Sequence, residues 1–418
     1  MRELEFDIGS ILKLSVLDSL MVKSQQNLIN RSIFNFVTIT RSEGEEEVDV
    51  IVKVVERWYI WPVPILQFAD RNINAWIEKR DLSRINFGVD LRVDNFRGRM
   101  EGLNVILQFG YDVKAELRWS IPYLTDDQVI GMYFDGGVQL NHTIAYQTVD
   151  NKEQFFTSTK GYAQQNHYSI VGLTLRPKFN FFHGIQLGFN HLTFQDTVLS
   201  LNPDFAYEDT DYNYFSLAYA FKLDFRDYKP YPLKGYYFDV SLGKMGFGFF
   251  NKDVNRISAN ASFDQYIKLY HRWFFAYNVA GQISNNNQQL PYFIKSGLGY
   301  HPNNIRGYEL YVVDGQQIAI FKSNVKFEIL PRTTFQINWI KSTKFRKSFI
   351  ALYANLFFDM SYVSDVYTEE LNPMANQLLY ATGVGIDIIT YYDLVLRLEY
   401  SINKQGYTGF FINFVSPI

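Results

Sequence analysis

Cysteine is absent from the 418 residues of this sequence. The chain therefore forms no disulfide, has no thiolate ligand for a metal and uses no cysteine nucleophile. Long apolar segments are also lacking, because no run of about 18 apolar residues occurs, the length that a membrane-spanning helix needs. A helical membrane protein is thereby excluded. A β-barrel is not, since only alternate residues of each strand face the lipid.

Sequence motifs of common enzymes are missing as well. The six histidines include no H-x-x-x-H spacing of a metalloprotease helix, and no G-x-S-x-G elbow of a serine esterase is present. The formal net charge of −3 gives no basic excess for binding nucleic acid. Carboxylates such as Asp264, Asp387 and Glu399 could pair for acid–base chemistry, but a polar lumen contains such residues by construction. We expect no enzymatic activity, no cofactor, no metal and no nucleic-acid partner.

Aromatic side chains are abundant, at 17% of the residues, which is typical of the girdles that border a membrane barrel. From residue 58 onward apolar and polar residues alternate. Residues 212–226 and 235–250 alternate over more than the roughly 5–6 residues of an ordinary strand and the ~9–11 that cross a bilayer. Turn signals divide residues 58–418 into sixteen segments, and even strand numbers are usual in single-chain barrels. We predict a mainly β fold with a 16-stranded antiparallel transmembrane β-barrel.

Residues 1–57 have a different pattern. Apolar residues at helical spacing follow Ser15, which we expect to cap a helix that ends near Asn30. Short strands are expected at residues 3–6, 36–39 and 48–55. The segment is therefore predicted to be one small α+β domain that precedes the barrel. No apolar signal segment follows Met1, so we expect the natural chain of an outer-membrane protein to start upstream.

One arginine stands out in the long connection of residues 285–315, within Asn304-Ile305-Arg306-Gly307-Tyr308. The alternation further on places two carboxylates, Glu328 and Asp359, on the inner face of neighbouring strands. If the loop folds into the lumen, the guanidinium of Arg306 can bind both carboxylates through charge-assisted hydrogen bonds. Gly307 would permit a tight turn beside it. The alternative is a solvated arginine in an ordinary surface loop.

These residues carry a resemblance to a known family. Ile305-Arg306-Gly307-Tyr308 resembles the V/I-R-G-F/Y lid-loop motif of the outer-membrane protein assembly and secretion family typified by BamA and TamA. Phe357-Phe358-Asp359-Met360-Ser361 resembles its F-x-D-x-G strand motif, with Ser361 where glycine is usual. Glu328 falls where the family has a second acidic partner for the lid arginine. The resemblance therefore implies that Glu328 and Asp359 latch the lid.

Other segments extend the resemblance over nearly the whole chain. The family's D-x-x-D…P-x-x-G hairpin is matched at Asp224, Asp227, Pro232 and Gly235. Residues 28–37 and 54–57 resemble parts of the last POTRA domain, which precedes the barrel in this family. Residues 407–414 resemble the aromatic-ended signal by which barrels are recognised for assembly. The resemblance thus implies a POTRA-like periplasmic domain at residues 1–57 and a barrel at residues 58–418.

The resemblance also implies a function in the bacterial outer membrane. The protein would insert or export polypeptides through a laterally openable barrel, with the lipid bilayer, client or secreted polypeptides and accessory assembly proteins as partners. An insertase and a dedicated exporter of one partner protein, of the two-partner-secretion type, stay open as alternatives. A passive solute channel is a third, although a simple channel needs neither a lid nor an N-terminal domain. The N-terminal domain either offers strand edges to clients or braces the barrel mouth.

The first predicted barrel strand contains two prolines, Pro62 and Pro64. Neither can donate a backbone hydrogen bond, and residues two apart present their N–H groups to the same neighbour. The last strand, which contains Phe410, Ile412 and Phe414, must meet the first to close the barrel. We predict that the prolines face the last strand and leave few hydrogen bonds there, so that this seam is a lateral opening for client strands.

Overall fold

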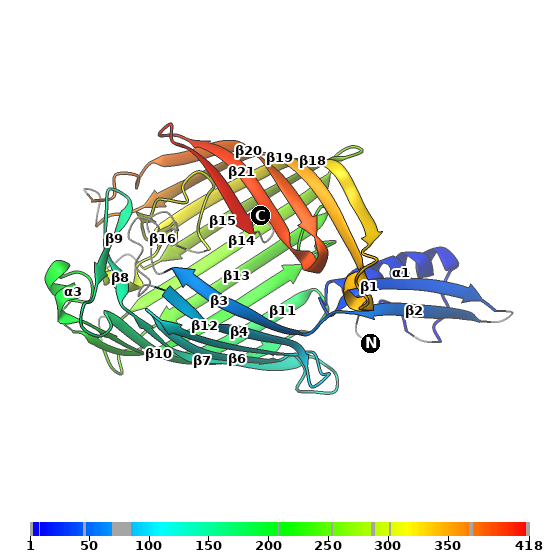
Figure 1. Cartoon of the computed structure of the whole chain (residues 1–418), viewed down its shortest axis with the longest axis horizontal. Coiled ribbons are helices and arrows are strands. Elements are labelled where there is room, and N and C mark those ends of the chain that lie inside the picture. The colour runs from blue at the N-terminus through cyan, green and yellow to red at the C-terminus, as the bar shows by residue number, and fades with distance from the viewer. Residues whose placement is uncertain are drawn as a thin grey trace.

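The computed structural model describes residues 3–7, 9–44, 47–68, 85–207, 209–251, 254–285, 289–300, 302–367 and 371–414. An N-terminal unit lies at one end of a large strand barrel (Figure 1). The unit consists of α1 (Leu14–Ile29), β1 (Phe34–Glu43) and β2 (Val48–Glu56). The strands β1 and β2 form an antiparallel pair, and α1 packs on β1. Leu17, Met21 and Leu28 recur at helical spacing and are buried, so α1 turns its apolar stripe to the sheet.

Two details of the N-terminal unit differ from the sequence prediction. The helix begins one residue before Ser15, so this serine lies inside the helix and does not cap it. The strand predicted at residues 3–6 does not form, because the described backbone there is in turns and bends. Asn27 of α1 instead donates a hydrogen bond from Nδ2 to Glu3 O at 3.2 Å. The segment is therefore held by helix side chains rather than by a neighbouring strand.

Sixteen strands form one antiparallel sheet, as predicted. Each strand pairs with the next barrel strand along the chain, and Figure 1 shows the sheet curving round into a barrel. The strands are β3 (Ile60–Phe68), β4 (Ile85–Phe96), β5 (Glu101–Gly110), β6 (Val113–Ile121), β7 (Ile130–Asn141), β10 (Gln164–Leu175), β11 (Phe181–Phe194), β12 (Asp211–Asp224), β13 (Gly235–Met245), β14 (Arg256–Lys268), β15 (Trp273–Ser284), β18 (Gln317–Gln336), β19 (Lys347–Ser364), β20 (Leu378–Thr390), β21 (Val395–Asn403) and β22 (Thr408–Phe414).

The distribution of side chains over the two faces of this sheet is the reverse of that in a soluble protein, because apolar side chains are exposed and polar ones are buried. Large apolar side chains such as Leu173, Leu187 and Leu242 are about half exposed, at 52%, 54% and 50%. The alternate positions hold polar side chains that are buried, for example Asn278 at 5% and Glu399 at 2%. An apolar exterior around a polar interior is what alternating strands produce when lipid surrounds the barrel.

Long connections gather at the barrel end opposite the N-terminal unit (Figure 1). They contain β8 (Thr143–Val149), β9 (Lys152–Thr157), α3 (Asp196–Leu201), η2 (Tyr292–Ile294), β16 (Gly297–Leu298) and β17 (Val313–Asp314). An apolar cluster that includes Ile144, Val198 and Tyr292 joins three of these connections. At the other end, α4 (Thr343–Arg346) and η4 (Tyr391–Asp393) lie in shorter turns. No helix of the described part of the chain is both long and apolar enough to cross a membrane.

Candidate functional site

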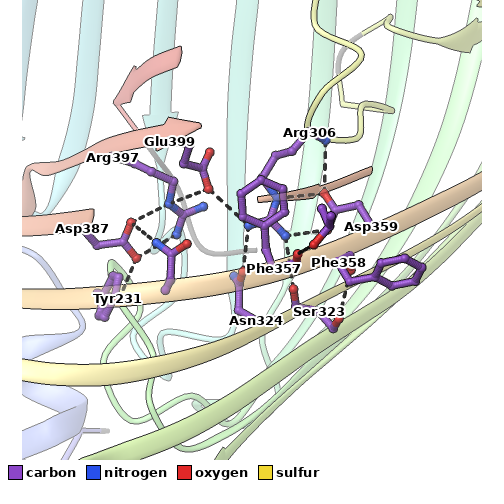
Figure 2. Close-up of polar contacts among 12 residues, drawn as sticks. Tyr231, Arg306, Ser323, Asn324, Phe357, Phe358, Asp359, Asp387, Arg397 and Glu399 are labelled. Atoms are coloured by element: carbon purple, nitrogen blue, oxygen red, sulfur yellow. Dashed lines mark hydrogen bonds and ion pairs between the residues drawn. The ribbon is translucent and has the colours of Figure 1, made fainter. Parts of the chain in front are cut away.

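Arg306 of the lid loop, residues 285–315, lies inside the barrel against Asp359 of β19 (Figure 2). Arg306 N and Nε donate hydrogen bonds to Asp359 Oδ2 at 3.1 and 2.8 Å, and Arg306 Nη2 forms an ion pair with Oδ1. The Asp359 side chain is fully buried and that of Arg306 is 12% exposed. A planar guanidinium that meets both carboxylate oxygens forms the strongest type of charged hydrogen-bonding pair. The structure thus brings these two predicted residues together.

The neighbouring strand completes the pocket for the guanidinium. Arg306 Nη1 donates to Asn324 Oδ1 at 2.7 Å, and Nη2 to Ser323 O at 3.4 Å. The guanidinium carbon also lies 3.9 Å from the centre of the Phe357 ring, which is a cation–π contact. Gly383, opposite Phe357 in β20, leaves space for that ring, because a Cβ there would lie 2.6 Å from it. Strands β18 and β19 therefore hold the arginine, and β20 leaves room for the ring beneath it.

The second carboxylate on Arg306 is Glu399 of β21, and the prediction that it is Glu328 was wrong. Arg306 Nη1 donates to Glu399 Oε1 at 3.3 Å, whereas Glu328 accepts a hydrogen bond from Tyr353 Oη at 3.0 Å. Residue alternation gives the face of a strand but not the height along it. Glu328 lies four residues beyond Asn324, which is roughly 13 Å along β18. The alternation that places Glu399 inside the barrel was visible in the sequence, but its distance from the lid was not.

The rest of the lid motif packs on β20 and β21. Ile305 and Tyr308 are each 2% exposed, and Tyr308 Oη donates to Gln405 Oε1 at 2.7 Å. Gly307 has φ +81°, a conformation that favours glycine, and a Cβ there would lie 2.8 Å from Ala381 Cβ. All four motif residues therefore occupy one crowded site. Only a residue without a Cβ fits at position 307 of this site.

Ser361 of the strand motif stands where the resembled family has glycine. Its side chain is 1% exposed, and its hydroxyl has no hydrogen-bond partner among the described residues. Asp359, two residues away on the same face, keeps its contacts with Arg306. The serine is thus accommodated without displacing the lid arginine.

The hairpin motif organises the turn between β12 and β13. Asp227 Oδ1 accepts backbone N–H groups of Tyr228, Leu233 and Lys234 at 2.9, 3.0 and 3.2 Å. Asp224 forms ion pairs with Arg226 at 2.8 Å and with Lys229 at 3.2 Å. Pro232 is buried, and Gly235 has φ +98°. These contacts explain the spacing of the motif, since each residue fixes one part of the turn.

This hairpin inserts Tyr231 into the lumen, which the sequence did not indicate. Tyr231 is 4% exposed, and its hydroxyl donates to Asp387 Oδ2 of β20 at 2.7 Å. Asp387 is fully buried and pairs with Arg397 of β21, whose Nε lies 2.6 Å from Oδ1. Arg397 Nε in turn lies 3.7 Å from Glu399 Oε1 (Figure 2). The lid arginine and the hairpin are therefore at the two ends of one charged cluster.

β3 and β22 are the two ends of the sheet, and no ladder joins their described residues. Asp94 N donates to Tyr59 O at 2.7 Å, so the pair just before β3 is hydrogen-bonded. By the alternation of an antiparallel ladder, Pro62 and Pro64 then occupy positions that turn their nitrogens away from β4. Both prolines thus face the free edge of the first strand, on the side of the predicted seam.

The last strand presents its free edge in a complementary way. Asn403 N donates to Tyr407 O at 3.0 Å, and the same alternation turns the N–H groups of Phe410 and Ile412 away from β21. Their side chains are 63% and 61% exposed on the outer face. The backbone of Phe414 ends β22, while its side chain lies outside the described residues.

The comparison with protein families decides what kind of barrel this is. Residues 95–414 match the model of the Omp85 superfamily domain. The chain belongs to the Omp85 superfamily. No curated protein matches the sequence. As an Omp85 member the chain is an outer-membrane β-barrel, of a superfamily that inserts or transports proteins.

Solved structures of two other proteins have the same fold. BamA from Haemophilus ducreyi lacking POTRA domains 1–3 superimposes with a TM-score of 0.54 at 14% identity, over 99% of this chain and 79% of that one. CdiB from Escherichia coli superimposes with a TM-score of 0.50 at 13% identity, over 99% and 71%. At such low identities the matches establish the fold and not the individual function.

Aromatic side chains close the end of the Omp85 barrel seam that lies beside the N-terminal unit. We call Trp58, Trp61, Phe345 and Tyr392 the aromatic clasp. The rings of Trp61 and Phe345 lie 4.9 and 5.7 Å from that of Tyr392, and Trp58 N donates to Tyr392 Oη at 3.1 Å. Tyr392 has φ 60° and ψ 31°, a left-handed conformation that costs energy in a residue with a Cβ. The clasp joins β3 to the β20–β21 turn across the seam.

A cavity of about 730 Å³ occupies the lumen next to the lid arginine. It is lined mainly by amide, hydroxyl and charged groups, and it extends from Arg306 and Glu309 of the lid loop to Asn413 of β22. The Glu309 side chain is exposed to this cavity, on the same wall as Glu399. Among the described residues, no group of side chains forms a metal site.

Proposed function

We propose that this protein is an outer-membrane assembly or translocation factor that inserts or exports polypeptides through a laterally opening barrel. The observation that carries the proposal is the absence of a ladder between the described residues of β3 and β22. Unpaired strand edges are templates for another strand, and a barrel that is only a channel has no use for them. A client strand would pair with a free edge and leave sideways into the membrane.

The two edges are not equivalent. On β3, Pro62 and Pro64 remove two donors from the edge, so β3 is a poor partner for closing the barrel. On β22, the N–H groups of Phe410 and Ile412 stay available. We infer that the prolines keep the seam easy to open and that β22 is the better template for an incoming strand.

The lid is evidence against the function of a passive solute channel. Arg306 enters the lumen and is bound by Asp359 and Glu399, whose side chains are buried. A barrel with such a lid conducts poorly and irregularly, whereas a solute channel conducts in steady, uniform steps. Single-channel recording in planar bilayers therefore separates the two functions.

For the N-terminal unit we propose a POTRA-like role in the periplasm, with β1 and β2 as strand edges that clients meet. Asn30, at the end of α1, also contacts the β12–β13 hairpin at 3.2 Å through Asp227 O. The unit therefore braces the barrel mouth as well. Accessory assembly proteins would bind on this side of the membrane.

The test is assisted folding of an outer-membrane barrel client into liposomes that contain the purified protein, followed by protease resistance of the client. We expect faster folding than in empty liposomes. Ile412→Pro removes one donor from the free edge of β22 and should abolish the acceleration, while Ile412→Ala keeps the donor and should retain most of it. Equal activity of both variants would show that the β22 edge is not the template.

The second candidate is a dedicated exporter of one partner protein, favoured by the cavity that runs from the lid to β22. An exporter would release its partner through the lumen after the lid opens. It would fail to accelerate folding of unrelated barrel clients but would secrete one specific polypeptide.

A further inference from the structure

A continuous set of polar contacts crosses the barrel from the N-terminal unit to the lid. It begins at Asn30, which follows the last residue of α1. Asn30 Nδ2 donates to Asp227 O at 3.2 Å, and Lys229 N donates to Asn30 Oδ1 at 3.1 Å. One amide side chain therefore uses both its donor and its acceptor on the backbone of the β12–β13 hairpin. Movement of the N-terminal unit consequently acts directly on this hairpin.

The hairpin reaches the lumen through Tyr231. Its hydroxyl donates to Asp387 Oδ2 at 2.7 Å, and its ring lies 5.0 Å from the ring of Tyr353 and 4.4 Å from Lys326 Nζ. Asp387 is also bound by Arg397, whose Nε lies 2.6 Å from Oδ1 and whose Nη2 lies 3.2 Å from Oδ2. Tyr231 and Arg397 thus share one carboxylate oxygen.

The Arg397 guanidinium contacts two carboxylates. Besides Asp387, it lies 3.7 Å from Glu399 Oε1, the same oxygen that accepts a hydrogen bond from Arg306 Nη1 at 3.3 Å (Figure 2). Arg397 and Arg306 therefore compete for Glu399. A shift of Arg397 toward Asp387 strengthens the hold of Glu399 on the lid, and a shift toward Glu399 weakens it.

Cations and carboxylates lie close together in this buried region. Its carboxylates are Asp359, Asp387 and Glu399, and its cations are Arg306, Arg397, Lys326 and Lys322, the residue opposite Asp359 on β18. When the lid leaves with Arg306, Glu399 loses one of its two arginine contacts. Arg397 can stay beside Glu399 only if Asp387 has another partner, and the Tyr231 hydroxyl is that partner, since a hydrogen bond to a charged group is stronger than one to a neutral group.

We propose that Tyr231 is a positioning residue that makes the lid easier to open and that transmits the docking of the N-terminal unit to Arg306. With the hydroxyl in place, Asp387 is partly satisfied by the Tyr231 hydrogen bond and binds Arg397 less strongly, so Arg397 stays near Glu399. Without it, Arg397 moves to Asp387 and Glu399 binds Arg306 alone. The inference rests on the proposed function only in requiring that the lid opens.

The test measures lid opening directly. The chain has no cysteine, so a single cysteine in place of Leu298 can be labelled without background. Leu298 is 1% exposed and packs with Ile305 and Tyr308 of the lid, so its labelling rate reports opening. In the full chain in liposomes, Tyr231→Phe keeps the ring and should slow labelling by about three- to ten-fold, the size that residues along a coupled network usually show.

Two further variants distinguish coupling between the N-terminal unit and the lid from a general disturbance of the barrel. Asn30→Ala acts from outside the lumen and should slow labelling in the same direction by a smaller factor, with no added effect in the double variant with Tyr231→Phe. Tyr353→Phe is the matched control, because Tyr353 is equally buried beside Tyr231 but donates to Glu328, which does not contact the lid. It should leave the labelling rate unchanged.

Several results would overturn the inference. They are faster or unchanged labelling in Tyr231→Phe, an equal effect of Tyr353→Phe, or additive effects of Asn30→Ala and Tyr231→Phe. Variants that merely loosen the barrel speed labelling, so the expected slowing cannot come from loss of stability. Client folding is measured on the same liposomes, so a shifted labelling rate without client folding would refute the proposed function and leave the role of Tyr231 standing.

Discussion

Asp359→Asn is the substitution that tests the lid contact most severely. The asparagine has nearly the same shape as aspartate but no charge, so the backbone and the packing of β19 are preserved. Arg306 then keeps Glu399, Asn324 and the Phe357 ring as partners. What is lost is the carboxylate that accepts hydrogen bonds from three nitrogens of Arg306.

The size of the effect follows from the burial of this pair. Breaking a buried ion pair by removing one partner costs about 3–5 kcal/mol. The remaining partners favour the lower end, and about 3 kcal/mol corresponds to roughly a 100-fold change in the lid equilibrium. We therefore expect the Leu298→Cys reporter to be labelled about 100-fold faster in Asp359→Asn.

Glu328→Gln provides the matched comparison. Glu328 is a lumen-facing carboxylate of the adjacent strand that binds Tyr353 and not Arg306. Its substitution should change the labelling rate by less than about two-fold, since it leaves the arginine untouched. If Asp359→Asn and Glu328→Gln gave the same rate, Asp359 would not be what holds the lid.

Two more outcomes follow from the structure. Gly307→Ala places a Cβ 2.8 Å from Ala381 at φ +81°, so it should speed labelling by about ten-fold or more, and an unchanged rate would mean that the loop adapts. Trp61→Ala removes a ring that contacts Tyr392 in the aromatic clasp and should increase crosslinking of client strands to β22, whereas Trp339→Ala, at an exposed position outside the clasp, should not.

Alternation and turn signals were enough to predict the barrel from sequence. Apolar and polar residues alternate along stretches such as residues 212–226, and the structure confirms sixteen antiparallel strands. The inward direction of Asp359 also followed from this pattern, because the side-chain period of a strand is two. These predictions succeeded since each depends on residues that are close in the chain.

Predictions that needed a distance across the lumen were less successful. Glu328 and Glu399 both face inward, and only the height of the lid in the barrel decides which of them Arg306 reaches. Tyr231 lies in a turn, where no periodicity indicates that a side chain enters the lumen. The left-handed conformation of Tyr392 has no sequence signal either, because glycine or asparagine would be expected there.

The same limit applies at the start of the chain. Residues 3–6 look like a strand, but their backbone accepts a hydrogen bond from Asn27 of α1 and donates one to the Ser24 hydroxyl of the same helix. A short segment with strand propensity adopts the conformation for which the fold offers partners.

Locking the seam tests the central claim most directly. One cysteine replaces Val63, between the two prolines, and a second is placed in turn along Thr408–Asn413 of β22 until a disulfide forms, which needs Cα atoms within about 7 Å. A disulfide between positions 187 and 217, which are paired already across β11 and β12 and lie away from the seam, serves as the control lock. The account predicts that the oxidised seam lock stops client folding into the membrane, that a reductant restores it, and that the control lock has no effect. Full activity of the seam-locked protein would contradict it.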